Sequence, residues 1–274
     1  MVTRRGTSLA GAHQFDADTA LEPLGPGRWR AWAPEHRFVG RGPNGGFLAA
    51  LAARGAEAAA GRPLRSLTLH FLAAPAVGPL ELGVVLEREG RWYSAASVRL
   101  EQEGRPVSLA VATLGDLPAE GAAWDAAAMP AATPLADTER MPLDQAGIPD
   151  FMRNYDLRWA VGTRPGTPAD VPETGGWIRT TEPRPLDAPL VAAMTDAWAP
   201  AAFVALGRFA AAPTLDLTIH LRRALPRPAM VPQDHVLGRF TSRLSVGGVW
   251  EEDGELWTPG GELLAHSRQL ALVR

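Results

Sequence analysis

The 274-residue sequence contains no cysteine. That absence excludes disulfide bonds, thiolate metal ligands and a cysteine nucleophile, and it is typical of a cytoplasmic protein. An excess of basic residues is lacking too, because the formal net charge at pH 7 is -3. Charge therefore gives no reason to expect nucleic acid or an anionic membrane surface as a partner.

Long apolar runs are absent as well, and no stretch is long enough to span a bilayer. The segment 1–15, MVTRRGTSLAGAHQF, contains two arginines but no apolar core of signal-peptide length. We therefore expect a cytoplasmic location and no membrane partner.

Two common catalytic signatures are missing. The sequence has no G-x-S-x-G, so a serine-hydrolase elbow is not indicated. Six histidines occur without the spacing of metal ligands, at His13, His36, His70, His220, His235 and His266. We expect no metal and no cofactor.

The chain does contain an internal repeat. The strand-like cores LTLHFL (67–72) and LTIHLR (217–222) align without a gap. Each follows an alanine-rich segment typical of a helix, at 45–60 and at 188–206, and each precedes several strand-like runs. The same order of elements twice indicates duplication.

A stretch rich in alanine, proline and acidic residues, about 116–142, separates the two copies and lacks sustained periodicity. We predict an N-terminal domain over 12–116, a connector over 117–149 and a C-terminal domain over 150–274. The strands YDLRWAVG and GGWIRTTE are expected near the start of the second domain.

Alternation along the strands indicates a sheet with one buried face. In the segment 214–221, the residues expected on the buried face are Leu215, Leu217, Ile219 and Leu221, and those on the other face are Thr214, Asp216, Thr218 and His220. Short turns between neighbouring runs require antiparallel pairing. The predicted fold class is α+β, with an antiparallel sheet wrapped over a central helix in each half.

The segment GRGPNGG reads G-x-G-x-x-G at Gly40, Gly42 and Gly45, and it leads directly into the first predicted helix. A dinucleotide fold would place a parallel strand after that helix, with an acidic residue at its end. The strand that follows here, SLTLHFLAAP, ends without an acid and leads into hairpins, and Pro43 lies inside the turn. The pattern therefore argues against a dinucleotide site.

Two interpretations of the helix start remain. Free N–H groups at Gly45 and Gly46 could hold a carbonyl oxygen or an anion, since a glycine lets a ligand approach the backbone. Alternatively, the glycines form only a tight turn under a packed helix.

Asp196 stands in the apolar run PLVAAMTDAWAPAAF, where a carboxylate is costly unless it is paired, hydrogen-bonded or used. It is either a site residue or an exposed helix residue. Thr214 opens a strand and Gln269 lies in the last one, where the first half has Ala112. Alone, each has an ordinary structural interpretation; together with Asp196 they form an acid, amide and hydroxyl set able to orient and deprotonate a water.

These segments carry a resemblance to a known family. The chain resembles the TesB-like acyl-CoA thioesterases in the order and spacing of four segments. In the first half these are GRGPNGGFLAALAARGA and SLTLHFLAAP, and in the second half they are APTLDLTIHLRRALP and GELLAHSRQLALVR. The resemblance implies a double hotdog, two tandem domains whose sheets each wrap a central helix. It also implies an acyl-CoA substrate and a homo-oligomer.

The resemblance gives roles to particular residues. It implies that Asp196, Thr214 and Gln269 orient the hydrolytic water, and that the thioester carbonyl or the CoA arm binds at the substrate-binding segment Asn44, Gly45 and Gly46. The repeated histidines, His70 and His220, are either strand residues satisfied by hydrogen bonds or, in one case, a substrate contact. A non-catalytic acyl-thioester-binding or scaffold protein on the same fold is the alternative function. A hotdog hydratase would need a histidine near Asp196, which the sequence does not supply.

Overall fold

The structure is a computed structural model that describes residues 12–116, 122–145, 147–227 and 230–273. The segment considered above for a leader lies mostly outside the described residues, and so do the first residues of the predicted connector and Arg274.

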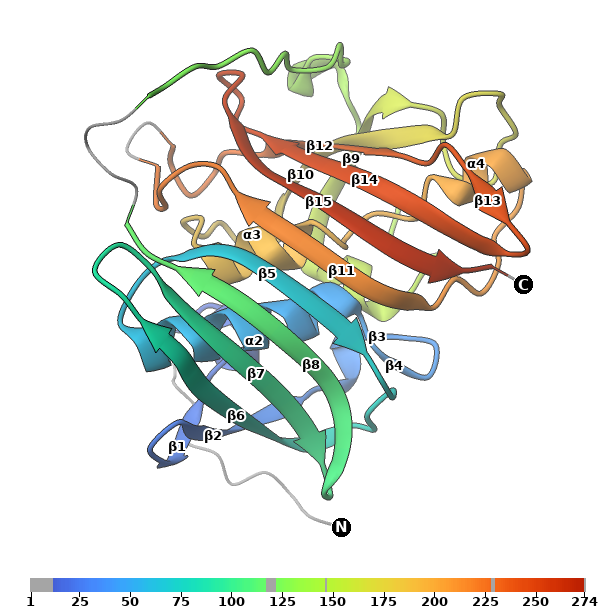
Figure 1. The fold of residues 1–274 in the computed structure, drawn as a ribbon. Coiled ribbons are helices and arrows are strands. Elements are labelled where there is room, and N and C mark those ends of the chain that lie inside the picture. Colours follow the sequence, from blue (N-terminus) through green and yellow to red (C-terminus); the bar gives the residue numbers. More distant parts are fainter. Residues whose placement is uncertain (1–11, 117–121, 146, 228–229, 274) are drawn as a thin grey trace.

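One large antiparallel sheet forms most of the molecule (Figure 1). Its strands follow the order β1-β2-β6-β7-β8-β5-β11-β15-β14-β12-β10-β9, with β13 paired to β14. In the first half the strands are β1 Glu22–Gly25, β2 Arg28–Ala33, β5 Leu64–Phe71, β6 Gly78–Glu89, β7 Ser94–Gln102 and β8 Arg105–Leu114. In the second half they are β9 Tyr155–Gly162, β10 Glu173–Thr180, β11 Thr214–Leu221, β12 Val236–Thr241, β13 Ser245–Val246, β14 Val249–Trp257 and β15 Leu263–Leu272.

The repeated strands β5 and β11 join the halves, since they pair with each other in the middle of the sheet. Leu67 lies opposite Ile219 and Leu69 opposite Leu217, and all four side chains are buried. Every strand pair of the described residues is antiparallel, which confirms the predicted α+β class and excludes a parallel dinucleotide fold.

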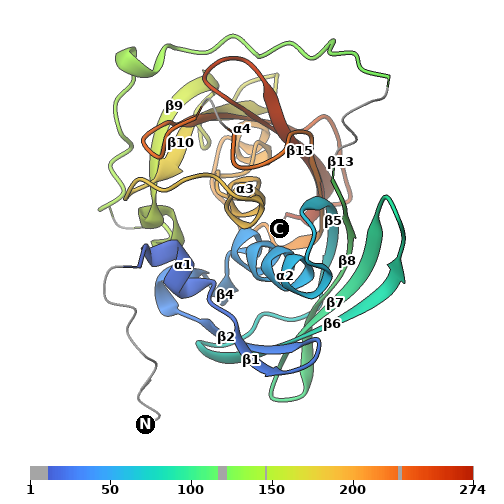
Figure 2. The ribbon, with the colours of Figure 1, turned by 90° about the vertical axis from the view of Figure 1, so that its left-hand side faces the viewer.

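The sheet curves around two helices that pack on each other (Figure 2). They are α2, Gly45–Ala60, from the first half and α3, Ala188–Met194, from the second. The remaining elements are short: α1 Gln14–Asp18, α4 Ala202–Leu206, the hairpin strands β3 Phe38–Val39 and β4 Gly42–Pro43, and the 3-10 turns η1 Glu35–Arg37, η2 Leu135–Asp137 and η3 Asp150–Asn154.

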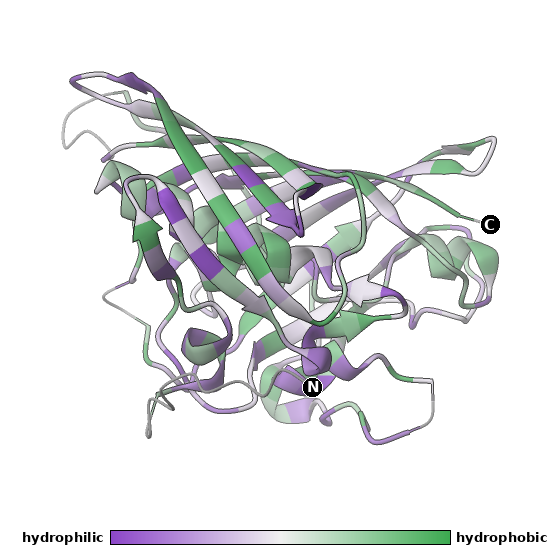
Figure 3. Ribbon diagram, turned by 90° about the horizontal axis from the view of Figure 1, so that it is seen from below, coloured by the Kyte–Doolittle hydropathy of each residue, from purple (hydrophilic) through white to green (hydrophobic). Residues whose placement is uncertain are grey.

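Five of the ten buried residues of α2 are alanines, and their small volume lets the helix lie close to both α3 and the sheet. Asn44 caps the helix N-terminus, and Gly61 ends it in the left-handed region at φ 61°. Green and purple alternate along the strands in Figure 3, so that apolar residues face the helices.

The second predicted helix is interrupted, which corrects the expectation of a continuous helix over 188–206. After Met194 the chain forms a turn, and α4 begins only at Ala202. Pro200 disfavours helical geometry at the residue before it. The α-helical pattern has ended before that residue, because the N–H of Asp196 donates to Ala193 O, three residues back, over 3.4 Å. Asp196 therefore lies on the linker between α3 and α4 and not on a core helix.

A bulge corrects the predicted alternation in β11. Leu217, Ile219 and Leu221 are buried as expected, but Leu215 is exposed. The pairing of β11 with β15 shifts register between Thr214 and Asp216, so residues before the bulge change face. Thr214 is thereby turned toward β15 instead of sharing the outer face with Asp216.

The strands that join the halves allow a matched test of burial. Leu217 is fully buried in β11, whereas Leu215 on the same strand is 36% exposed. We expect Leu217→Ala to lower the free energy of unfolding by about 2–5 kcal/mol, because it removes buried carbons and leaves a cavity. Leu215→Ala should cost about 1 kcal/mol or less. Urea denaturation measures both, and equal losses would contradict the assigned bulge.

Candidate active site

The carboxylate of Asp196 lies at the contact between the two halves. Its Oδ2 accepts a hydrogen bond from the Gly46 backbone N–H over 2.8 Å and another from Asn44 Nδ2 over 2.9 Å. Asn44 Nδ2 also donates to the Asp196 backbone carbonyl over 2.7 Å. The donors belong to the first half and the acceptor to the second, so the site exists only when both halves are packed together.

Asn44 is held by contacts on both sides of its amide. Its Oδ1 accepts from the Phe47 N–H at the first turn of α2, which directs Nδ2 toward Asp196. Its backbone N–H donates to Arg37 O over 2.8 Å, and the residue is only 6% exposed. The donor that faces Asp196 is therefore fixed before any substrate arrives.

Glycine is required at both positions of the helix start, because atoms of neighbouring residues approach the backbone too closely for a side chain. A Cβ on Gly46 would lie 2.4 Å from Ala193 O of α3, and one on Gly45 would lie 2.9 Å from Asp196 Oδ2 and 2.8 Å from the Phe71 ring. Both interpretations of the glycines thus describe part of the structure. They allow tight packing of α2 on α3, and they expose backbone N–H groups that hold an anion, which is the Asp196 carboxylate.

Burial raises the pKa of Asp196 to about 6 from 3.8. The hydrogen bonds from Gly46, Asn44 and Gly45 oppose that shift, because they favour the charged form. Part of the residue remains accessible. The result is a carboxylate that is ionised at neutral pH and yet basic enough to take a proton from water.

Thr214 and Gln269 are brought together by the bulge and by the pairing of β11 with β15. Thr214 Oγ1 donates to Gln269 Oε1 over 3.0 Å. Gln269 is 5% exposed and points toward the helices, as Ala112 does at the corresponding place in β8. Among the described residues, no hydrogen bond links Asp196 directly to Thr214 or to Gln269.

A further buried acid, Glu252 on β14, was missed by the sequence analysis. It is 4% exposed, accepts from Gln269 Nε2 over 2.7 Å and accepts from the Ala201 N–H over 2.6 Å. Burial raises its pKa to about 8, and the nearby charge of Asp196 adds to the shift. The signal was present in the alternation of β14, where Glu252 shares a buried face with Trp250 and Leu256.

His70 lies elsewhere. His70 follows the buried Leu69 on β5, and its own side chain is exposed on the outer face of the sheet. Its strand partner on β11 is Asp216. His70 is therefore not gathered with Asn44, Gly45 and Gly46 in this structure. Its repeat partner His220 contacts His266, with ring nitrogens 3.1 Å apart.

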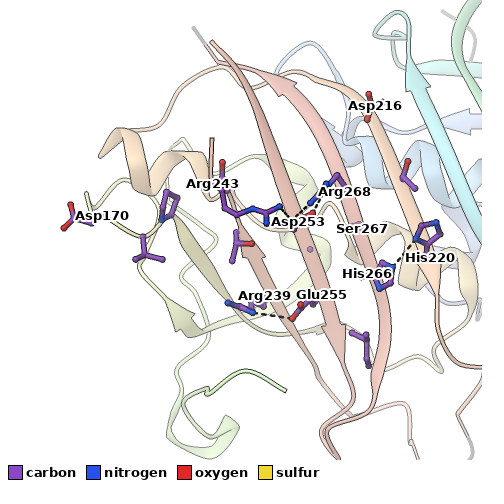
Figure 4. A pocket seen from close by; sticks show the side chains of 17 residues that line it. Asp170, Asp216, His220, Arg239, Arg243, Asp253, Glu255, His266, Ser267 and Arg268 are labelled. Atoms are coloured by element: carbon purple, nitrogen blue, oxygen red, sulfur yellow. Dashed lines mark hydrogen bonds and ion pairs between the residues drawn. The ribbon is translucent and has the colours of Figure 1, made fainter. Parts of the chain in front are cut away.

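The outer face of the second half carries a groove of about 1020 Å³ (Figure 4). Its charged side chains pair mainly with one another, as Arg268 and Arg243 do with Asp253. The groove is not lined by Asp196, Thr214 or Gln269. It lies on the opposite face of the sheet from them and is not the candidate site.

Within the described part of the chain, no group of three or more histidine, aspartate or glutamate side chains is arranged to hold a metal ion. Over the same residues, no helix combines the length and apolar character needed to cross a bilayer.

The antiparallel sheet curved around two packed helices, together with similar solved structures, defines the class of protein. A structure from Alicyclobacillus acidocaldarius described as having a hot dog fold matches with a TM-score of 0.86 and 27% identity, over 96% of this chain and 98% of that one. A candidate thioesterase II from Thermobifida fusca matches with a TM-score of 0.82 and 26% identity, over 95% and 97%. The chain is a double hotdog protein.

Family models identify the particular family. The N-terminal domain of acyl-CoA thioesterases matches residues 33–115, and the C-terminal domain matches residues 125–273. The chain therefore belongs to the TesB-like acyl-CoA thioesterase family. An uncharacterized protein of Mycobacterium tuberculosis is 31% identical over 266 residues, which cover 87% of this chain and 88% of that protein.

The raised pKa of Asp196 predicts a pH-dependent effect on stability. An acid whose pKa is about 6 in the folded state and 3.8 in the unfolded state costs the folded state about 3 kcal/mol once ionised. That cost is absent below pH 3.8, grows up to about pH 6 and is then constant. Asp196→Asn removes the charge and keeps an acceptor oxygen, so it should stabilise the protein by about 2–3 kcal/mol at pH 8.

Urea denaturation at pH 8 and at pH 4 measures this difference, which should nearly vanish at the lower pH. Asp170→Asn, at an exposed loop residue, is the matched control and should change little at either pH. A gain for Asp196→Asn that is equal at both pH values would contradict a buried ionised carboxylate.

Proposed function

We propose that this protein hydrolyses acyl-CoA thioesters to the free acid and CoA. The observation that carries the proposal is the Asp196 carboxylate with its pKa near 6, held between the two halves by Asn44 and Gly46. Membership of the thioesterase family gives the substrate class.

Asp196 acts as the general base or water-orienting carboxylate. Its Oδ2 is held by the two donors, and Oδ1, which receives neither hydrogen bond, accepts a proton of the attacking water. The water oxygen adds to the thioester carbonyl to give a tetrahedral intermediate. Its collapse breaks the C–S bond, and the proton held by Asp196 goes to the departing CoA sulfur.

Thr214 and Gln269 hold the water in line with Asp196. Because Thr214 donates its own proton to Gln269 Oε1, its oxygen lone pairs are left to accept a hydrogen bond from the water. The bulge in β11 serves this arrangement, since it turns Thr214 to the same side as Gln269.

The start of α2 lies beside the reacting carbonyl and stabilises its developing negative charge through the positive end of the helix, while the Gly46 N–H stays on the Asp196 carboxylate. The lack of side chains on Gly45 and Gly46 lets the thioester carbonyl or its CoA arm approach this helix start. Asn44 keeps this helix start in place.

The decisive test removes the base without removing its hydrogen bonds. Asp196→Asn should reduce thiol release from acyl-CoA by about 100-fold or more, because an amide cannot take the proton. Thiol release is followed with a chromogenic disulfide over acyl-CoA substrates of increasing chain length.

Asp170→Asn, purified and assayed in the same way, should match the unaltered protein. Full activity in Asp196→Asn would refute the role of Asp196. Tight acyl-CoA binding with no release from any acyl-CoA, by the unaltered protein, would favour the non-catalytic alternative.

The pKa of Asp196 also predicts how the rate depends on pH. The base must be ionised, so kcat/KM should be low well below pH 6, rise about tenfold per pH unit there, and level off above about pH 7. Initial rates from about pH 4.5 to pH 8 with one acyl-CoA measure the profile. A rate that stays flat down to the lowest pH would mean that Asp196 is not the titrating base.

A further inference from the structure

Glu252 contacts two segments of the site, one with each oxygen of its carboxyl group. Oε1 accepts from Gln269 Nε2 over 2.7 Å, and Oε2 accepts from the Ala201 N–H over 2.6 Å. Ala201 lies on the linker between α3 and α4, which also carries Asp196. One buried side chain therefore connects the segment that holds the base with the strand that holds the water-binding amide.

We infer that Glu252 is a positioning residue for the hydrolysis proposed above, on which this inference rests. It determines which way round the Gln269 amide lies, and it ties the linker that carries Asp196 to β14 and β15.

The chemistry of the amide explains the first role. A glutamine side chain has a donor end and an acceptor end of nearly equal size, so its shape does not choose between the two orientations. Glu252 presents an acceptor, which draws Nε2 of Gln269 toward it and leaves Oε1 facing Thr214. In the reverse orientation Thr214 would have to accept, and its proton would be directed at the place of the water.

The first half of the chain shows that the fold itself does not need this acid. The equivalent rows of facing residues are Leu217, Gln269 and Glu252 across β11, β15 and β14, and Leu67, Ala112 and Ala96 across β5, β8 and β7.

Ala112 and Ala96 are both fully buried, so an apolar pair packs well at this position of the sheet. A buried carboxyl is costly by comparison, as its raised pKa shows. Among the residues that the structure describes, only in the second half does a buried acid hold a glutamine amide and a linker N–H, so we assign its function to these two contacts.

The test begins with Glu252→Gln. Both oxygens of Glu252 can accept even when one carries a proton, as its pKa of about 8 implies at neutral pH. Glutamine has a single acceptor oxygen, so it cannot accept from both Gln269 and the Ala201 N–H. Either Gln269 reverses or the linker loses its hydrogen bond. We expect kcat for thiol release to fall by about tenfold or more, the order seen when a supporting hydrogen bond of a site residue is lost. KM should stay within about twofold, because Glu252 does not touch substrate.

The control is Glu255→Gln, the same change on the outer face of the same strand, and it should leave kcat unaltered. Melting temperatures of both variants confirm folding. An unaltered kcat in Glu252→Gln would overturn the proposal.

Exchanging the two side chains separates positioning from packing. When Glu252→Gln is combined with Gln269→Glu, the amide now at position 252 accepts from the Ala201 N–H and donates to the carboxylate now at position 269. That carboxylate still accepts from Thr214, so all directions of hydrogen bonding are restored at constant charge and nearly constant volume. The double variant should recover much of the lost kcat, and a double variant no faster than Glu252→Gln would overturn the orientation role.

A readout without activity keeps this inference distinct from the proposed function. The side-chain amide signal of Gln269 in a 15N NMR spectrum is identified by its loss in Gln269→Glu. It should lie downfield of ordinary glutamine amides and move in Glu252→Gln but not in Glu255→Gln. If the signal behaves so while the unaltered protein releases no thiol, the hydrolysis fails and the anchoring of Gln269 stands. A signal that Glu252→Gln leaves in place overturns the inference.

Discussion

The hydrogen bonds between the start of α2 and the Asp196 carboxylate are the interaction on which the site depends. The first N–H groups of a helix have no partner within the helix, and here Gly46 N–H is satisfied by a carboxylate from the other half. The same contact provides Asp196 with the donors that make its burial tolerable. Each half supplies what the other lacks, which explains why duplication in one chain suits this fold. Neither half alone would contain a complete site.

Much of the fold could be predicted from local pattern. The repeat of LTLHFL and LTIHLR identified β5 and β11, which proved to be the strands that join the halves. Period-two alternation and short turns correctly predicted an antiparallel sheet, because both depend on residues close in sequence. The domain boundaries at 12–116, 117–149 and 150–274 stay a prediction, as do a homo-oligomer and a role for His70 in substrate binding.

The features that were missed depend on contacts between distant residues. The break between α3 and α4 could have been suspected from Pro200, but the alanine-rich pattern favoured a continuous helix. The bulge at Thr214 is a matter of register with β15, and no local pattern in β11 reports register. Glu252 was overlooked because two consecutive glutamates usually indicate an exposed segment. It lies two residues after Trp250, however, and therefore shares the buried face of β14.

The two halves use the same position of the sheet differently: the first half has an apolar pair there, and the second half has a polar pair. Where β7 and β8 face each other with alanines, β14 and β15 face each other with Glu252 and Gln269. An unpaired polar group at this depth would cost about 1–3 kcal/mol, so each must be satisfied by another, and the chain of donors from Ala201 to Thr214 does this. A network of this kind is stable only when complete. Its completeness is also what makes it directional, because Glu252 fixes the Gln269 amide and Gln269 in turn takes the Thr214 proton. The lone pairs of Thr214 are thereby left as acceptors, which is the property that the proposed hydrolysis asks of this hydroxyl.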